Sequence, residues 1–460
     1  MKKLFDEVNS LDKRCYDKFD LTEDILMEHA ASSMADFITK KFAPKTTVLI
    51  VSGAGNNGAD GIALGRLLYD RYKIKLYLPN NVKSDMAKLQ LQRAKKCGIK
   101  IVSKIIKADV IVDCLFGTGL SRPLNNVAID IIKHINTLKG YKIACDIPSG
   151  IDTKGNISTI AINADITITM GGLKTALFSD IAKDYVGKIK VASLGLQNNI
   201  YQTSTNMFLL QKNDLKLPSR DKYNTHKGSF GHLTIVSGNK KGASIIAAKA
   251  AFNMGVGLLS IVTNDSLNIP SYIMYNTTIP SNTTALAIGM GLGFDVDIKK
   301  YIDMNVPMVI DADLFYYDNI KDMLTKQNIV ITPHPKEFCS ILSILNIANI
   351  SVKQLQEDRM GFVKLFCKKY PNVVLVLKGA NSIIGQKNKF YINKFGDSRL
   401  SFGGSGDVLS GIIAGLLAQG YKPKEAAIVG SLIHTLAAKK YKNNLFSLNP
   451  NRLIGLIKKL

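Results

Sequence analysis

Short runs of β-branched and aliphatic residues alternate with helical stretches along this chain, and that alternation limits the fold more than any other feature. In the first half the runs are TVLIVS, KIKLYLP, DVIVDCLF, YKIACDIP, ADITITM and GKIKVASLG. The second half repeats the style with HLTIVSGN, LLSIVTN, PMVIDAD, NIVITPHP and NVVLVLKG. Strands that are apolar along their whole length are buried on both faces, and the helices between them supply the cover. The pattern predicts an α/β fold with parallel sheets between layers of helices.

The alternation is interrupted once, which divides the chain into two parts. After Gly195 comes QNNIYQTSTN, a polar stretch without periodicity. A chain of 460 residues also exceeds what one hydrophobic core normally supports. We therefore expect two domains, residues 1–210 and 211–460, of which the first is a Rossmann-like three-layer domain.

Composition excludes several classes of protein. The net charge of +24 comes from lysines spread along the chain, without a basic block and without tryptophan, so we expect no nucleic-acid partner. No apolar run approaches the roughly 20 residues that a bilayer-spanning helix needs, and we expect no membrane partner. The six cysteines are scattered without metal-ligand spacing, which favours a reducing cytoplasm over a disulfide framework or a zinc site.

Three predicted strands of the first half end in glycine-rich turns that carry oxygen-bearing side chains. The turns lie in VSGAGNNGADG, DCLFGTGL and CDIPSGID. Ligands of open α/β sheets bind beyond the carboxyl ends of the strands, so the three turns point at one crevice. Hard oxygen donors suit a hard cation or a hydroxyl-rich ligand better than zinc. The alternative is that these side chains only cap helices and satisfy turn amides. They are Asn56, Asn57, Asp60, Asp113, Asp146 and Ser149.

The second half ends in the stretch GGSGDVLSGIIAGLL, which crowds glycines before an apolar helix. Convergent backbone N–H groups at a helix start stabilise a phosphoryl group, and Asp407 stands where it could accept a proton from an attacking hydroxyl. Lys378 follows another strand in VLKGANS, and His334 stands between two prolines in ITPHPKEF. The alternative is an ordinary aspartate in the first turn of a helix with a flexible lead-in.

The motifs of the first half, together with the helix ILMEHAASSMADFI, resemble those of the NAD(P)H-hydrate epimerase family over about residues 5–195. The resemblance implies a potassium ion near Asn57, Asp113 and Ser149, and a proton-transferring, substrate-binding role for Asp146. Ala59 stands where the family usually has glycine, and it would be strained if its φ were positive. The other implied substrate contacts are Asn56, Asn57, Gly58, Ala59, Asp60, Gly117, Thr118, Gly119, Leu120, Ser121, Arg122 and Pro123.

The second half is similar to the ribokinase-like ADP/ATP-dependent NAD(P)H-hydrate dehydratase family over about residues 225–440. The matching pieces are HKGSFGHLTIVSGN, AIGMGLG, VIDAD, ITPHPKE, VLKGA and GGSGDVLSGIIAGLLAQG. Met290 and Ser405 replace the usual proline and threonine. The implied hydrate contacts are Ala243, Gly291, His334 and Asp407. The implied nucleotide contacts are Lys378, Gly379, Ala380, Asn381, Ser382 and Gly406.

The two resemblances together imply a bifunctional repair enzyme. Its substrates would be the hydrates of NADH and NADPH, called NADHX and NADPHX, and ADP or ATP would donate phosphate with Mg²⁺, with ADP favoured. A homo-oligomer is compatible with the sequence. Two alternatives stay open: the second half could be a small-molecule kinase whose product keeps its phosphate, and the first half could be a non-catalytic binding module.

Overall fold

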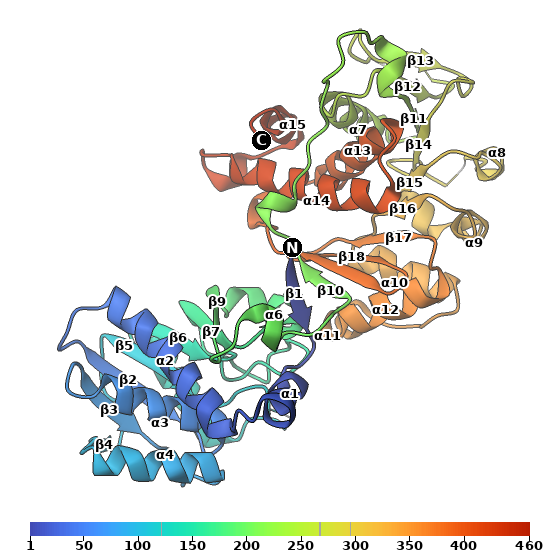
Figure 1. Cartoon of the computed structure of the whole chain (residues 1–460). Helices are drawn as coiled ribbons and strands as arrows, with labels where there is room; N and C mark the ends of the chain where they lie inside the picture. The colour runs from blue at the N-terminus through green and yellow to red at the C-terminus, as the bar shows by residue number, and fades with distance from the viewer. Residues whose placement is uncertain (121, 266–267, 295) are drawn as a thin grey trace. The chain divides into compact units, whose positions relative to one another are not determined.

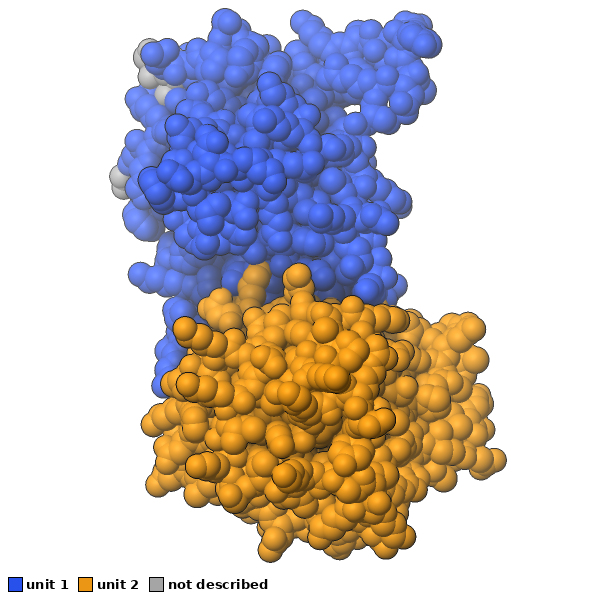
Figure 2. All heavy atoms as spheres, turned by 90° about the vertical axis from the view of Figure 1, so that its left-hand side faces the viewer, with its two compact units in different colours: residues 1–2, 206–460 blue, residues 3–205 orange. Residues whose placement is uncertain are grey.

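A computed structural model describes residues 1–120, 122–265, 268–294 and 296–460 of the chain. The chain forms two compact units, Lys3–Thr205 and Met1–Lys2 with Asn206–Leu460, which Figure 2 colours separately. The division falls a few residues before the predicted one. The reason is that β10 (Met207–Leu209) pairs with β19 (Lys389–Asn393) and so belongs to the second unit.

The sheet of the first unit is parallel throughout, in the order β4-β3-β2-β5-β6-β7-β9. Every run predicted as a strand in the first half contributes one strand to it. The chain builds outward from β2 in one direction and then returns to add β5 on the other side, so the order reverses between β2 and β5 (Figure 1). Such a reversal leaves a crevice at the carboxyl ends of the two strands. The strands are β2 (Thr47–Ser52), β3 (Lys73–Tyr77), β4 (Ile101–Val102), β5 (Val110–Cys114), β6 (Tyr141–Cys145), β7 (Ile166–Met170) and β9 (Lys188–Ala192).

Helices cover both faces of this sheet, which confirms the three-layer prediction. One apolar cluster joins the sheet to the helices α1 (Asn9–Phe19), α2 (Glu23–Lys41), α3 (Asn56–Leu68) and α4 (Asp85–Lys96). A second cluster joins the opposite face to α5 (Asn126–Thr137). The short elements β1 (Lys2–Phe5) and β8 (Leu173–Lys174) pair in parallel, and α6 (Asn198–Tyr201) follows the sheet.

The sheet of the second unit is parallel except for β18, which runs antiparallel to both β17 and β19, in the order β13-β12-β11-β14-β15-β16-β17-β18-β19-β10. The hairpin β18–β19 was not expected. Only two residues separate these strands, too few for a parallel crossover, and Lys387 turns the chain with a φ of 54°. The strands are β11 (His232–Val236), β12 (Leu258–Val262), β13 (Met274–Asn276), β14 (Ala285–Ile288), β15 (Met308–Ile310), β16 (Ile329–Ile331), β17 (Val374–Leu377), β18 (Ser382–Gln386), β19 and β10.

Two groups of helices enclose this second sheet. On one face α7 (Lys241–Asn253), α13 (Ser405–Ala418), α14 (Pro423–Lys439) and α15 (Pro450–Ile457) form one apolar core with the strands. A Cβ at Gly411 of α13 would lie 2.2 Å from the Ala247 carbonyl oxygen, so glycine allows α13 and α7 to pack closely. On β17 and β18 packs α12, whose Phe366 meets Phe338 of α10 edge to face. The remaining helices are α8 (Lys299–Ile302), α9 (Ile320–Leu324), α10 (Pro335–Ile344), α11 (Val352–Glu357) and α12 (Arg359–Lys369).

Two expectations from the sequence concern membrane-spanning helices and the cysteines. Among the described helices, none combines the length and the apolar composition that crossing a membrane requires. All six cysteines are free thiols, four of them buried.

Candidate active sites

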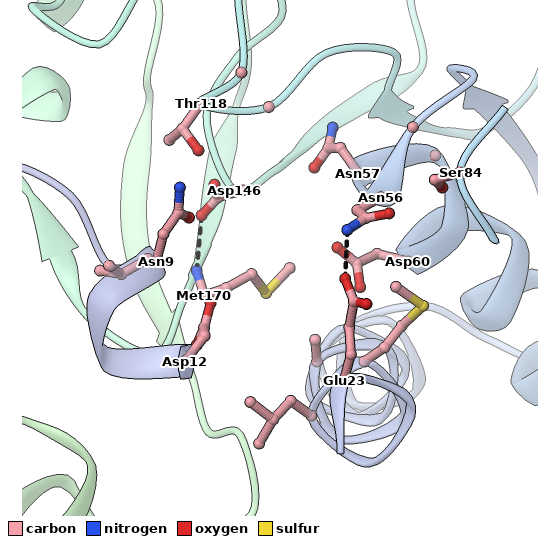
Figure 3. Close-up of a pocket in the computed structure, with 18 of the residues that line it drawn as sticks. Asn9, Asp12, Glu23, Asn56, Asn57, Asp60, Ser84, Thr118, Asp146 and Met170 are labelled. Atoms are coloured by element: carbon pink, nitrogen blue, oxygen red, sulfur yellow. Dashed lines mark hydrogen bonds between the residues drawn. The ribbon is translucent and has the colours of Figure 1, made fainter. Parts of the chain in front are cut away.

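A cavity of about 730 Å³ opens in the first unit where the strand order reverses. Its walls come from α1, α2, the turn between β2 and α3, the loop after β5, and the residue that follows β6 (Figure 3). The three glycine-rich turns therefore meet in space, as the sequence predicted. The predicted contacts that line the cavity are Asn56, Asn57, Gly58, Asp60, Gly117, Thr118, Gly119, Leu120 and Asp146.

The other predicted contacts lie elsewhere. Ala59 is fully buried in α3 with Met27 and Ala87, so its methyl group faces the core and not the cavity. Its backbone is helical, and the strain considered for a positive φ does not arise. Arg122 and Pro123 are exposed and are not among the lining residues. Ser121 lies outside the described residues.

The three residues expected to hold potassium are connected through short contacts. The Ser149 hydroxyl donates to Asp113 Oδ1 at 2.6 Å, and the Ser149 amide donates to Asp113 Oδ2 at 2.8 Å. The same hydroxyl accepts from the Phe116 amide at 2.8 Å. A Cβ on the next residue, Gly117, would lie 3.3 Å from Asn57 Oδ1. Asn57 thus stands beside the loop that Asp113 and Ser149 hold.

Two features of this cluster are costly unless a ligand is present. Both amide atoms of Asn57 are buried without a hydrogen-bond partner, and an unpaired buried polar group costs free energy. Asp113 is 1% exposed, and burial raises its pKa to about 6 although Ser149 and the Leu115 amide donate to it. A bound cation would be coordinated by Asn57 Oδ1 and would offset the charge of the buried Asp113, while Asn57 Nδ2 would need an acceptor from a ligand.

Carboxylates crowd the remaining wall of the cavity. Asp146 follows β6 with a φ of 68°, and its Oδ1 accepts from the Met170 amide at 3.0 Å (Figure 3). Asp12, Glu23 and Asp60 also line the cavity. Burial, reinforced by the charges of Asp146 and Asp12, raises the pKa of Asp60 well above its usual value.

The sequence interpretation missed part of this wall. Asp12 and Tyr16 share one face of α1 at a spacing of four residues, and Glu23 accepts a hydrogen bond from Asn56. The spacing of Asp12 and Tyr16 could have indicated this face. The helix lies before the glycine-rich turns in the sequence, however, and those turns were what located the site. The sequence interpretation also missed Lys174, which pairs with Asp146. Lys174 follows β7 in the stretch GGLKTALF, where nothing in the local sequence indicates a function.

In the second unit, the glycine cluster places Asp407 in the first turn of α13. The residue before the helix, Gly404, has a φ of 89°, which an L-residue adopts only with strain. No hydrogen bond reaches the Asp407 carboxylate from the described residues. Burial and the neighbouring Asp311 charge raise its pKa to about 6. A free carboxylate with that pKa suits a general base.

A buried lysine faces this helix start. Lys378 Nζ lies 2.9 Å from Asp311 Oδ1 and 3.8 Å from Glu337 Oε2. Burial opposes the ammonium charge, but these two carboxylates outweigh it and raise the pKa of Lys378. A Cβ at Gly406 would lie 3.2 Å from Nζ. The lysine and the amides of α13 thus present positive charge in one place.

The predicted hydrate contacts of the second unit fall into two groups. A Cβ at Gly291, whose φ is 64°, would lie 3.0 Å from Ala243 Cβ, so these two are neighbours. His334 caps α10, because its Nδ1 accepts from the Lys336 and Glu337 amides at 3.1 and 3.2 Å. Since Nδ1 accepts both hydrogen bonds, Nε2 carries the ring proton. Burial and the nearby Lys378 lower the pKa of His334.

The predicted nucleotide contacts follow β17. A Cβ at Gly396 would lie 2.2 Å from the Ala380 carbonyl oxygen and 3.5 Å from that of Gly379, so this loop packs on Gly396. Asn381 is buried at 2% exposure, and Ser382 begins β18. The sequence interpretation assigned no function to Asp311, Glu337 and Ser410. Asp311 Oδ2 accepts from the Ser410 hydroxyl at 2.6 Å, and these contacts orient Lys378.

The fold and these two clusters define a two-domain α/β enzyme with one separate site in each unit. A family model described as "NAD(P)H-hydrate dehydratase" matches residues 233–459, and one described as "YjeF-related protein N-terminus" matches residues 23–176. A protein of Helicobacter pylori named "Bifunctional NAD(P)H-hydrate repair enzyme Nnr" is 41% identical over the full length of both chains. A protein of Escherichia coli with the same name is 31% identical, with 94% of this chain and 88% of that one covered. The chain belongs to the family of bifunctional NAD(P)H-hydrate repair enzymes.

A solved structure offers a further likeness. An ADP/ATP-dependent NAD(P)H-hydrate dehydratase from Bacillus subtilis, co-crystallised with ATP and Mg²⁺, is 23% identical with a TM-score of 0.48. It covers 56% of this chain and 98% of its own.

Proposed function

We propose that the first unit interconverts the R and S epimers of hydrated NADH and NADPH, and that the second unit converts the S epimer to NAD(P)H at the expense of ADP or ATP. The observation that supports this most strongly is the unpartnered Asp407 carboxylate beside Lys378, in a chain 41% identical along its length to a repair enzyme of that name. ADP is the favoured donor. The epimerase would feed the dehydratase with the epimer that it accepts.

The chemistry of the second unit follows from its charges. Asp407 accepts the proton of the substrate hydroxyl as the hydroxyl oxygen attacks the terminal phosphorus of the nucleotide. The bond from that phosphorus to the nucleotide breaks, and AMP or ADP leaves. Phosphate then departs from the ring carbon as a neighbouring proton is lost, which restores the double bond. Lys378 and the amides at the start of α13 stabilise the charge on the transferred group.

Magnesium enters this proposal with the nucleotide. Among the described residues, no group of three or more His, Cys, Asp or Glu side chains is arranged to hold a metal ion. Mg²⁺ bound to the nucleotide phosphates would neutralise charge during transfer. Asp311 and Glu337, beside Lys378, are the carboxylates available to such an ion.

Potassium belongs to the first unit. The unpartnered Oδ1 of Asn57 and the buried carboxylate of Asp113 fit a cation with oxygen ligands, and the Ser149 hydroxyl donates to Asp113 Oδ1. Bound K⁺ would supply a fixed positive charge at the carboxyl ends of β2 and β5. Asp146 binds the substrate and transfers its proton.

The proposal also covers the cellular compartment and the oligomeric state. We place the enzyme in the cytoplasm, in keeping with its six free thiols, and allow a homo-oligomer. The alternative function, a small-molecule kinase joined to a non-catalytic binding domain, is disfavoured. A binding module gains nothing from keeping the carboxylate-lined cavity and the Asn57–Asp113–Ser149 cluster.

Recovery of NADH absorbance from a mixture of R and S hydrates tests the division of labour. With ADP or ATP the wild-type chain should convert the whole mixture. Asp146→Ala should slow the R fraction and spare the S fraction, while Asp407→Asn should abolish recovery from both. Asp303→Asn, at an exposed aspartate of the same unit as Asp407, is the matched control and should behave as wild type. Loss of both fractions in Asp146→Ala, or recovery in Asp407→Asn, would contradict the proposal.

A further inference from the structure

A lysine without access to solvent stands behind the cavity of the first unit. Lys174, at the end of β8, is 1% exposed. Its Nζ forms an ion pair with Asp146 Oδ1 and a 3.0 Å hydrogen bond to the Thr169 hydroxyl. Burying an ammonium group is expensive, and it is tolerated when the charge is paired and hydrogen-bonded. Lys174 is placed to act on one carboxylate.

The donors around Asp146 treat its two oxygens differently. The Thr169 hydroxyl, the Met170 amide and Lys174 Nζ all donate to Oδ1. No described residue donates to Oδ2. Because Asp146 lines the cavity, Oδ2 is the oxygen that a ligand can reach. Oδ1 of the Asp146 carboxylate is therefore fixed by hydrogen bonds, and Oδ2 is free to contact a ligand.

The backbone of Asp146 is constrained as well as its side chain. Asp146 adopts a left-handed φ of 68°, which a residue with a Cβ adopts only when its surroundings impose it. Its amide donates to the Ile168 carbonyl at 2.8 Å, so β7 fixes both the main chain and, through Thr169 and Met170, the side chain. Strained backbone of this kind concentrates at functional sites.

The charges that face Asp146 make the lysine necessary. Carboxylates of Asp12, Glu23 and Asp60 line the same cavity from α1, α2 and α3. Asp12 in turn accepts a 2.6 Å hydrogen bond from Tyr201 of α6. Like charges in one cavity repel one another, and an opposite charge offsets that repulsion at the group it contacts. Among these four carboxylates, only Asp146 forms an ion pair with Lys174.

We infer that Lys174 is a positioning residue of the epimerase: together with Thr169 and Met170 it holds Oδ1 of Asp146 and leaves Oδ2 facing the cavity, toward the hydroxyl of the substrate. This rests on the proposed epimerase function and adds a residue to it. Oδ2 accepts the hydroxyl proton as the bond between the hydroxyl-bearing carbon and the ring nitrogen breaks, which leaves an aldehyde and places the electron pair on the conjugated nitrogen. Oδ2 returns the proton to the oxygen as the nitrogen adds to the other face of the aldehyde, so the cycle involves no net transfer of protons, electrons or groups.

The test uses the full chain and mixed NADH hydrate epimers with the phosphoryl donor. Lys174→Met keeps the length of the side chain and removes its charge. We expect kcat for the R fraction to fall by about a hundredfold or more while the S fraction reacts at the wild-type rate. KM for the R epimer should change much less than kcat, because the Oδ2 edge still binds. Lys174→Arg, which keeps the charge, should recover part of the rate.

The kinetics of folded protein separate positioning from a merely structural role. A structural role alone would reduce the amount of folded Lys174→Met protein and leave kcat per folded molecule unchanged, whereas positioning predicts that this kcat falls and that Lys174→Arg recovers part of it. Lys188→Met, at an exposed lysine of β9, is the matched control and should match wild type. An unchanged kcat for the R epimer in folded Lys174→Met protein would overturn the inference.

A second variant covers the case in which Lys174→Met does not fold. Thr169→Val removes one hydrogen bond to Asp146 Oδ1 and one from Lys174 but leaves the ion pair. It should lower kcat for the R epimer by about fivefold to tenfold, and an unchanged kcat would refute the inference. If the wild-type chain converts the S epimer but not the R epimer, the proposed epimerase function fails, and the inference fails with it.

Discussion

Asp407→Asn should make the enzyme inactive and more stable at the same time. The carboxylate is partly buried beside Asp311, and its pKa rises from 3.8 to about 6 on folding. The folded state therefore binds this proton more tightly than the unfolded state. The stability contribution is full below pH 3.8 and is lost as the pH rises through the folded pKa. Asparagine has no charge to bury at any pH.

The size of the effect follows from the two pKa values. A rise from 3.8 to about 6 corresponds to about 3 kcal/mol above pH 7, at 1.36 kcal/mol for each tenfold change in proton affinity. Solvent screens a partly exposed group, so we expect about 1–2 kcal/mol. At pH 5 the linkage relation leaves about half of that difference. Loss of a general base should lower the dehydratase rate by about 10² to 10⁴.

Urea unfolding of the full chain at pH 7.5 and pH 5 measures the stability, and NADH recovery measures the activity. The transition of the second unit should move to higher urea in Asp407→Asn, by more at pH 7.5 than at pH 5. The exposed substitution Asp303→Asn should leave both transitions unchanged. An Asp407→Asn protein that is destabilised, or equally stabilised at both pH values, would refute the burial argument.

Three further results are expected. The wild-type dehydratase rate should fall as the pH drops through about 6, because protonated Asp407 cannot accept the hydroxyl proton; a rate that stays flat between pH 5 and 8 would exclude this base. Gly291→Ala should cost about 1–3 kcal/mol and raise KM for the hydrate, because φ is 64° and the new Cβ would lie 2.4 Å from the Lys240 carbonyl oxygen, whereas Gly455→Ala, with open space around it, should be neutral in urea unfolding and kinetics. Asp113→Ala should abolish any dependence of R-epimer conversion on KCl and leave S-epimer conversion intact, and a retained KCl dependence would argue against the assigned potassium ligands.

The sequence predicts the strands of the first unit well because they are buried on both faces and read as unbroken apolar runs. The sequence predicts strands less well where they are short or paired in a hairpin. The hairpin β18–β19 depends on a two-residue turn at Lys387, a residue that carries no turn signal of its own. The short strand β14 is not predicted, because only its last two residues belong to the glycine motif AIGMGLG and the apolar run is four residues long.

The same contrast holds for the sites. Side chains at or just beyond strand ends, such as Asn57 and Asp113, could be found because the fold class says where strand ends meet. Asp407 could be found because glycines crowd the start of its helix. Lys174 and Asp12 could not be placed in this way. Lys174 reaches Asp146 from β8, and Asp12 enters the cavity from α1, so both depend on tertiary packing that no local pattern states.

Product stoichiometry tests the central claim most directly. The wild-type chain is incubated with NADH hydrate and ADP, and NADH, AMP and free phosphate are quantified together. The proposed function predicts one NADH and one free phosphate for each AMP formed, because the phosphorylated intermediate loses its phosphate at the same site. AMP formation with phosphate retained on the substrate and no recovery of NADH would contradict it and would identify the second unit as a kinase.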